Sequence, residues 1–489
     1  MPDVPDPALD FFERRFGAPP ESVEDVAAHG SRRRYWRLIG PGGETAVAAL
    51  GPDREENRAF LSFSRAFRSI GLPVPEIHAA DEEAGVWIME DLGDTTLFDL
   101  LEEARREGER APEEILAVYR AALEELIRFQ IEGDRVVDYD LAYPRAAFDR
   151  QSILWDLAYF KYHFLKLARI PFHEQRLETD FHALADFLLE ADTSFFLYRD
   201  FQSRNVMVRE GSPWFLDYQG GRRGALHYDV ASILYDAKAD LPEETRASLL
   251  EHYLDRLEER REVDREAFRA HYRGYVVVRI AQALGAYGYR GFYERKARFL
   301  HSVPYAAANL RRILERGLPV ELPEMQAAFE RIVEEWEGSG EPDVEEAGLT
   351  VYLTSFSYEG GYPEDAAGHG GGFVFDCRGL PNPGREEEHA DRTGLDEAVA
   401  GWLEERPSVA AFLERTAELV EAQVEEYRRR GFTSLSVAYG CTGGRHRSVY
   451  LVERIAGRIE QRFPDVRVRI VHREEPRWPR IAEEDAWTR

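Results

Sequence analysis

The sequence of 489 residues has little cysteine, little lysine and no long apolar run. Cys377 and Cys441 are its only cysteines, which excludes a disulfide-based fold and fits a reducing compartment. No run of about 18 apolar residues is available to cross a membrane. The first residues have neither the basic nor the apolar region of a signal peptide. We therefore expect a soluble cytoplasmic protein that does not bind membranes.

Basic residues are also scarce relative to acidic ones. The 63 Lys and Arg residues stand against 91 Asp and Glu residues, so the formal net charge is -28. Such a chain repels phosphate backbones and is a poor general binder of nucleic acid. Only four of the basic residues are lysines: Lys161, Lys166, Lys238 and Lys296. The positive charge is therefore carried almost entirely by arginine.

The pattern of strands and helices divides the chain into two domains. A polar, acidic stretch with glycine and proline at 336–347 is typical of a linker. Residues 1–335 begin with a small β-rich lobe around one helix and continue with mainly helical patterns, interrupted by a short β region at 195–219. Residues 348–489 alternate strands with helices. We predict an α+β bilobal fold with a helical second lobe, followed by a separate α/β domain.

One segment of the first domain predicts a phosphoryl-transfer site. Asp200 and Asn205 lie five residues apart in a polar turn between two apolar runs, and Asp217 ends the next strand. Phosphoryl transfer needs a carboxylate that orients or deprotonates the acceptor hydroxyl, and oxygen ligands that hold Mg²⁺ on the phosphates. We favour this interpretation over two hairpin turns capped by Asp and Asn side chains.

With this motif, residues 10–335 resemble the aminoglycoside phosphotransferase family of kinases. They are most similar to its AmgK-like sugar-kinase branch, which acts on N-acetylmuramate and N-acetylglucosamine. The resemblance implies a protein-kinase-like fold, with Asp200 as the catalytic base and Arg199 as a residue that positions the catalytic loop. It also implies Asn205 and Asp217 as Mg²⁺ ligands.

Two further positions bear on this loop. Tyr198 stands where the family commonly has histidine, at a position that packs and orients the loop. Asp229 lies in Tyr228-Asp229-Val-Ala-Ser, which matches a family segment whose Asp braces the active site. A carboxylate favoured at a helix N-terminus would describe nearly the same structure.

The resemblance also predicts where ATP would bind. Gly30 and Ser31 lie between two strands, where a kinase has the loop that covers the phosphates, and Arg32 adds positive charge. A plain polar hairpin explains this segment equally well. Glu90 and Leu92 fall in the connection whose backbone would bind adenine.

The strand at 45–50 departs from ordinary kinases because it lacks the lysine that pairs with the phosphates. Mg²⁺ together with Arg32, Arg34 or Arg54 could supply that charge, with a different geometry from lysine. Otherwise the domain is catalytically weak. Glu56 could be the helix-borne partner of such a cation, but we favour a solvated helix face.

The second domain contains a candidate anion site. A strand at 434–440 leads into Cys441-Thr-Gly-Gly-Arg-His-Arg-Ser and then into a helix. Backbone N–H groups at a helix N-terminus bind anions, and Arg445, His446 and Arg447 add charge-assisted donors. Such side chains are unfavourable at a helix N-terminus unless an anion is present. We therefore expect an anion to bind here.

Residues 348–475 resemble the RapZ C-terminal domain, which senses glucosamine 6-phosphate and binds small RNA. The most specific matches are Arg392-Thr-Gly-Leu-Asp and the loop that begins at Gly440. The Lys-His-Gly of that family appears here as Glu359-Gly-Gly. By this resemblance, a phosphosugar would be held by Arg378, Asn382, Thr442, Gly443, Gly444, His446 and Arg447.

These motifs together predict an ATP- and Mg²⁺-dependent phosphotransferase that acts on a sugar or amino sugar and carries a phosphosugar-binding domain. The alternative is a regulatory adaptor that senses nucleotide and phosphosugar without turnover, which the missing lysine favours. A cysteine phosphatase, based on Cys441 and Arg447 six residues later, is not favoured because no Asp general acid accompanies them.

The C-terminal region is locally basic. Between 428 and 480, 13 Arg residues stand against 5 acidic residues, and Arg alternates with apolar residues in 466–473. One face of that strand would therefore be basic. It could contact RNA or balance the neighbouring acidic helices, and the two interpretations have equal support.

Overall fold

The computed structural model describes residues 4–26, 33–294, 296–337, 349–363, 372–430, 432, 434–475 and 478. Among them, one compact unit comprises 4–289 and 302–337, and a second comprises 290–301 and the residues from 349 onward. Most of the predicted linker, 338–347, lies outside these ranges, and the predicted domain bounds stay a prediction. No described helix is long and apolar enough to cross a membrane.

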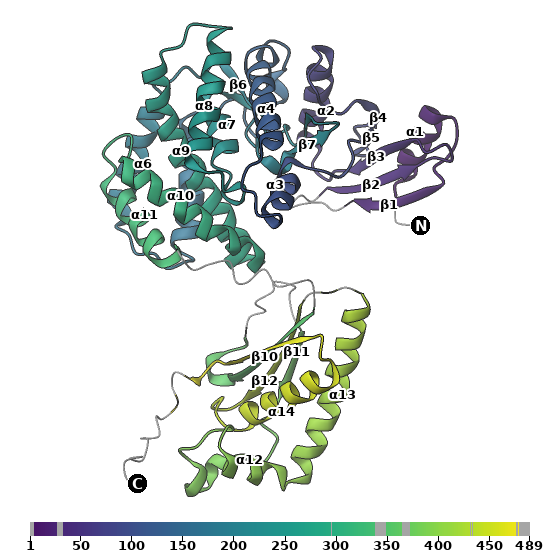
Figure 1. Ribbon diagram of the computed structural model, residues 1–489, viewed down its shortest axis with the longest axis vertical. Coiled ribbons are helices and arrows are strands. Elements are labelled where there is room, and N and C mark those ends of the chain that lie inside the picture. Colours follow the sequence, from purple (N-terminus) through teal and green to yellow (C-terminus); the bar gives the residue numbers. More distant parts are fainter. Residues whose placement is uncertain are drawn as a thin grey trace. The chain divides into compact units, whose positions relative to one another are not determined.

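The N-terminal lobe is an antiparallel sheet with strand order β1-β2-β3-β5-β4. Its strands are β1 Ser22–Val26, β2 Arg34–Ile39, β3 Thr45–Leu50, β4 Ile77–Asp81 and β5 Val86–Glu90. Neighbouring residues of a strand point to opposite faces. Ile88 therefore lies in the cluster with Phe12 of α1 (Asp6–Phe16), whereas the ring of Trp87 lies 5.5 Å from that of Phe60 on α2 (Arg54–Ser69). The two helices thus cover opposite faces of the sheet, and α1 is seen beside it in Figure 1.

Helix α1 corrects the prediction of a single helix before the second lobe. Its sequence starts among prolines, which are tolerated in the first helical turn because that turn has no internal acceptor for their missing N–H. Ala8 and Phe12, four residues apart, are fully buried against the sheet. The spacing of apolar residues that indicates a helix is therefore present in α1, but it extends over only one short segment.

The C-terminal lobe is helical, as predicted. Its helices are α3 Leu97–Arg106, α4 Glu113–Ile131, α5 Arg150–Phe160, α6 Glu174–Leu188, α7 His227–Leu234, α8 Glu243–Glu258, α9 Arg265–Gly288, α10 Val303–Arg316 and α11 Pro323–Trp336. Two small hairpin-like sheets interrupt them, formed by β6 Phe195–Leu197 with β9 Arg222–Gly224, and by β7 Val206–Arg209 with β8 Ser212–Phe215.

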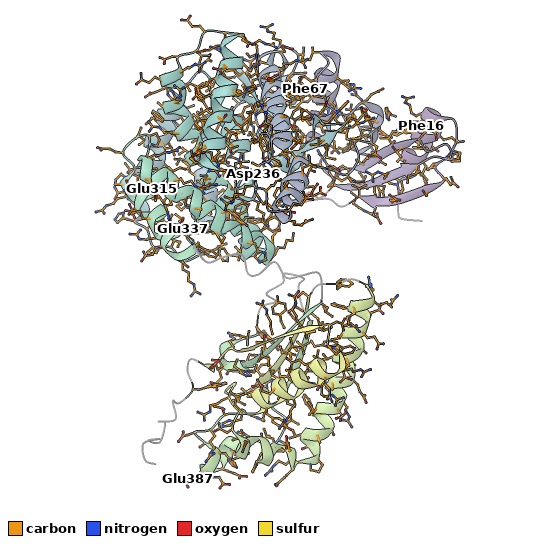
Figure 2. All side chains as sticks on the ribbon, viewed as in Figure 1. Phe16, Phe67, Asp236, Glu315, Glu337 and Glu387 are labelled. Atoms are coloured by element: carbon orange, nitrogen blue, oxygen red, sulfur yellow. The ribbon has the colours of Figure 1, made fainter. Side chains whose placement is uncertain are left out.

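An aromatic cluster packs α2 against the helical lobe. The ring of Phe67 meets the rings of Phe129, Phe196 and Tyr218 edge-on, at centroid distances of 4.9, 5.1 and 5.4 Å. Edge-to-face contacts of this kind are favourable beyond the apolar area that they bury. Phe67 is fully buried and is labelled on α2 in Figure 2. The cluster therefore fixes α2 relative to the strands that carry the catalytic motif.

The C-terminal domain has a parallel sheet with strand order β11-β12-β10-β13. The strands are β10 Thr350–Ser357, β11 Gly372–Asp376, β12 Ser434–Cys441 and β13 Arg467–His472, and the helices are α12 Glu397–Glu404, α13 Pro407–Arg429 and α14 Arg447–Arg462. Buried Leu353 and Val437 pack with Val452 and Ile455 of α14 in one core. The predicted fold class, bilobal α+β followed by α/β, is confirmed.

We expect Phe67→Ala to lower the free energy of unfolding of the N-terminal unit by about 3–5 kcal/mol, because it removes a ring from a packed core. Chemical denaturation followed by tryptophan fluorescence measures the change. Phe67→Leu is the matched control, since it keeps most of the volume, and its loss should stay below about 1.5 kcal/mol. Equal losses for both variants would contradict the packing role of the ring.

Candidate functional site

The structure brings the three residues of the phosphoryl-transfer motif together. Asp200 lies in the loop between β6 and β7, and Asn205 lies at the end of that loop. The amide nitrogen Nδ2 of Asn205 donates to the backbone carbonyl of Asp200 at 2.8 Å and to Oδ2 of Asp217 at 3.2 Å. One side chain thus links the predicted base to the second carboxylate.

The electrostatics around Asp217 favour a cation. The surrounding protein and the nearby carboxylate of Asp200 raise the pKa of Asp217 to about 6, although the residue keeps solvent exposure. Gln219 opposes that rise by donating to Oδ1 of Asp217 at 2.6 Å. The carboxylate of Asp217 and the remaining amide oxygen of Asn205 are the kind of oxygen ligand that Mg²⁺ prefers. These residues therefore fit a bound divalent metal ion.

Arg199 holds the catalytic loop from behind. Its φ of 85° is in the left-handed region, which is costly for a residue with a Cβ. Its guanidinium donates two bonds to the carboxylate of Asp156, at 2.6 and 2.7 Å, and one to the hydroxyl of Tyr228 at 2.7 Å. A paired fork of this type fixes orientation as well as position. In this structure Arg199 is a positioning residue.

A second carboxylate, Asp229, fixes the backbone of the same loop. Its two oxygens accept from the backbone N–H groups of Tyr198 at 2.8 Å and Arg199 at 2.9 Å. Asp229 is fully buried, and this burial raises its pKa to about 7 even though the two N–H bonds oppose the rise. The predicted bracing role of Asp229 thus has a concrete form, which is the support of two consecutive amides.

Three more side chains complete the support of the loop. The hydroxyl of Tyr198 donates to the carbonyl of Leu216 at 2.6 Å, just before Asp217. The hydroxyl of Ser203 donates to Asp236 at 2.5 Å, and Asp236 is labelled in Figure 2. No sequence pattern pointed to Asp156, Gln219 or Asp236. Gln219 lies two residues after Asp217, whereas the other two are far from the motif in sequence.

The predicted nucleotide residues are only partly visible. Gly30, Ser31 and Arg32 lie outside the described residues. Glu90 ends β5, and its carboxylate accepts from Arg209 at 2.9 Å, which ties the sheet to the helical lobe. Leu92 follows in the connection to α3 and is buried. Their contact with adenine stays a prediction.

A clamp holds this connection in place. Arg37 on β2 forms paired bonds to Asp91, at 2.7 and 3.1 Å, and to Asp94, at 3.0 and 2.7 Å. Burial alone would raise the pKa of Asp91, but the bonds from Arg37 and from the N–H of Gly93 lower it overall. One guanidinium thus binds two carboxylates, which restrains the backbone between the lobes.

The described arginines that could replace the missing lysine, Arg34 and Arg54, have different surroundings. Arg34 is exposed and lies over the ring of Trp36 at 4.7 Å, and Arg54 donates to the carbonyl of Glu83 at 2.8 Å. Arg33 also adds positive charge next to the predicted phosphate loop, but it was not among the arginines expected to replace the lysine. It is buried and forms an ion pair of 3.3 Å with Glu56. The interpretation of Glu56 as part of a solvated helix face is therefore wrong.

In the C-terminal domain, Gly444 shapes the predicted anion loop. Its φ of 62° is left-handed. A Cβ at this position would lie 2.6 Å from Cγ of Glu474 and 2.8 Å from the backbone nitrogen of Ser357. Only glycine fits this close approach. The neighbouring Thr442 and Gly443 are exposed in the loop that leads to α14, so they are accessible to a ligand.

Two residues that were predicted to bind a phosphosugar contact backbone carbonyls of the protein instead. The guanidinium of buried Arg447 donates to the carbonyls of Cys377, Arg378 and Leu380, at 3.3, 2.9 and 3.1 Å. His446 is also buried, and its Nε2 lies 3.1 Å from the carbonyl of His389. Burial lowers the pKa of His446. Both side chains therefore brace the loop against the segment that faces it.

The other predicted ligand residues lie on that facing segment. Arg378 is exposed, pairs with Asp376 at 2.7 Å and lies over the ring of Tyr358 at 3.8 Å. The side chain of Asn382 accepts from the N–H of Gly384 at 3.3 Å. Phosphosugar binding by these residues stays a prediction. RNA binding by β13, the strand that carries the exposed Arg469, also stays a prediction.

Comparisons with known proteins identify both parts of the chain. Residues 22–270 match the family model described as the phosphotransferase enzyme family, and residues 349–476 match the model of the RapZ C-terminal domain. Both resemblances found in the sequence are thereby confirmed at the level of the family. The first match spans more than half of the 489 residues, so it decides to which family the chain belongs.

Curated relatives match a shorter stretch. A nucleotide-binding protein of Thermotoga petrophila is 40% identical over 114 residues, which covers 23% of this chain and 39% of the relative. One from Shewanella halifaxensis is 39% identical over 126 residues, which covers 26% of this chain and 42% of the relative. The chain thus spans about two fifths of the length of the curated relatives that it matches.

Solved structures show similarity over more of the chain at low identity. An ethanolamine kinase from Plasmodium vivax is 12% identical, with a TM-score of 0.43, and covers 60% of this chain and 83% of its own. A choline kinase from Cryptosporidium parvum is 11% identical, with a TM-score of 0.42, and covers 60% of this chain and 91% of its own.

We expect Asp229→Asn to lower the free energy of unfolding by about 1–3 kcal/mol, since asparagine has only one acceptor oxygen for the two N–H groups. Denaturant unfolding measures this loss at several pH values. The pKa of Asp229, about 7 in the folded protein, lies above its ordinary value of 3.8. The folded state therefore binds this proton more tightly, and the contribution of Asp229 to stability falls as the pH rises from about 4 to 7.

Asparagine carries no such proton, so the stability difference between wild type and variant should narrow over that range. A difference that is constant between pH 4 and 7 would contradict the raised pKa of Asp229.

Proposed function

This chain belongs to the phosphotransferase enzyme family, and we propose that it transfers the terminal phosphoryl group of ATP to a hydroxyl group of a sugar or amino sugar. The observation that carries this proposal is the convergence of Asp200, Asn205 and Asp217, linked through the amide of Asn205. The substrate class is supported by the resemblance of residues 10–335 to the sugar-kinase branch, with N-acetylmuramate and N-acetylglucosamine as the first candidates.

In the proposed reaction, the carboxylate of Asp200 accepts the proton of the acceptor hydroxyl while its oxygen attacks the terminal phosphorus. A new P–O bond forms to the sugar, and the bond from that phosphorus to the bridging oxygen breaks, leaving ADP. Asn205 and Asp217 would hold Mg²⁺, which neutralises phosphate charge when bound. Arg199 and Asp229 keep the loop that bears Asp200 in position.

For the C-terminal domain, we propose binding of a phosphosugar at the loop Thr442–Gly444. Three features support this assignment: the left-handed Gly444, the exposed backbone before α14, and the bracing of the loop by Arg447. Amide groups at a helix N-terminus attract phosphate. The RapZ-like match makes glucosamine 6-phosphate the first ligand to test.

Asp200→Asn should lower kcat by about 10²–10⁴-fold, the usual contribution of a general base, because the amide cannot accept the hydroxyl proton. ADP release with a panel of sugars and amino sugars measures this effect. Asp10→Asn on the exposed side of α1 is the matched control and should retain full activity. Wild-type turnover by Asp200→Asn would refute the assignment of the base.

Gly444→Ala should weaken glucosamine 6-phosphate binding at least about tenfold, because the new methyl group displaces the loop from its left-handed conformation. Calorimetry on the full chain measures the affinity. Gly457→Ala makes the same chemical change on α14, where a Cβ meets open space, and should leave binding unaltered. Unchanged affinity in Gly444→Ala would place the phosphosugar elsewhere.

A further inference from the structure

We propose that Arg33 neutralises the phosphates of ATP in this protein, in place of the lysine that kinases carry on the third strand of the sheet. The inference rests on the proposed phosphotransfer and names the side chain that would bind the nucleotide. Four observations support it: the shape of β3, the position of the Arg33 guanidinium, its link to the metal-binding residues, and the placement of the other arginines.

Strand β3 leaves room where its lysine would be expected. On the face that packs against α2, the side chains of β3 are Val47 and Ala49, and both are apolar and buried. Ala49 stands opposite Trp87 on β5 and opposite Tyr35 on β2. A methyl group at this position is too short to fill the space above the sheet, so a side chain from a neighbouring strand can occupy it.

The guanidinium of Arg33 lies in that space. Its central carbon is 5.5 Å from the ring centroid of Trp87 and 5.5 Å from that of Phe60 on α2. Arg33 directly precedes β2 and shares the α2 side of the sheet with Arg37, because alternate residues of a strand point the same way. A planar guanidinium stacks on aromatic faces better than an ammonium group does. The two rings thus orient the charge.

A chain of polar contacts connects Arg33 to the metal-binding carboxylate. Nη2 of Arg33 lies 3.3 Å from Oε1 of Glu56. The same oxygen accepts from Nε2 of Gln219 at 3.3 Å, and this nitrogen also donates to Asp217 at 2.6 Å. The phosphates must lie next to Asp217 if that residue holds their Mg²⁺. Arg33 is therefore placed beside the phosphate position, with Glu56 as the helix-borne carboxylate that orients it.

The other described arginines of this region point elsewhere. Arg34 faces the side of the sheet that α1 covers, where it lies over Trp36. Arg54 binds the carbonyl of Glu83 in the turn before β5. Burying a charge is costly unless it is paired, and the ion pair with Glu56 stabilises the charge of the buried Arg33 guanidinium.

The test compares ATP with adenosine, which lacks phosphates. In Arg33→Met, calorimetry in the presence of Mg²⁺ should show ATP binding weakened about 10- to 100-fold, the usual effect of losing a charge-assisted bond. Adenosine binding should change less than about twofold. Arg65→Met on α2 removes an exposed ion pair with Glu82 and is the matched control, with both affinities unchanged.

Arg33→Lys guards against a folding defect, because it keeps the charge without the planar group. Its ATP affinity should fall between those of wild type and Arg33→Met. The proposal is overturned if Arg33→Met binds ATP like wild type, if it loses ATP and adenosine equally, or if Arg34→Met causes the larger loss of ATP. Wild type that binds ATP but phosphorylates no sugar would refute the proposed function and leave the Arg33 assignment standing.

Discussion

The catalytic loop depends on one carboxylate, Asp229, whose two oxygens accept the N–H groups of Tyr198 and Arg199. These bonds keep Arg199 in a left-handed conformation that its Cβ disfavours. The backbone carbonyl of the next residue, Asp200, accepts from the amide of Asn205. The aromatic cluster around Phe67 and the ion pair of Arg199 with Asp156 hold the elements that surround this loop.

Arginine provides several of the directed contacts that organise the described residues. Arg37 binds two carboxylates at the connection between the lobes, and Arg447 binds three carbonyls behind the anion loop. Lysine has no planar fork and could not form the paired bonds of Arg37. In this protein, where lysine is scarce, guanidinium groups position loops. By our proposal, one of them also binds nucleotide phosphates.

The two domains would bind phosphate through different groups. In the first, carboxylates and an amide converge, so a metal ion would mediate the contact with phosphate. In the second, the left-handed Gly444 and the start of α14 present backbone amides. The net charge of -28 therefore does not exclude local phosphate binding, because each proposed site would act through a few short-range contacts.

The sequence by itself determined the fold class, the two family resemblances and the residues Asp200, Asn205 and Asp217, because these depend on periodicity and on short, fixed spacings. The helix predicted after the glycine loop is also present, as α14. Tertiary structure alone decided the partners that come from distant segments, such as Asp156 for Arg199 and Glu56 for Arg33. Strand pairing and helix packing bring these groups together across long separations, and no local pattern records such contacts.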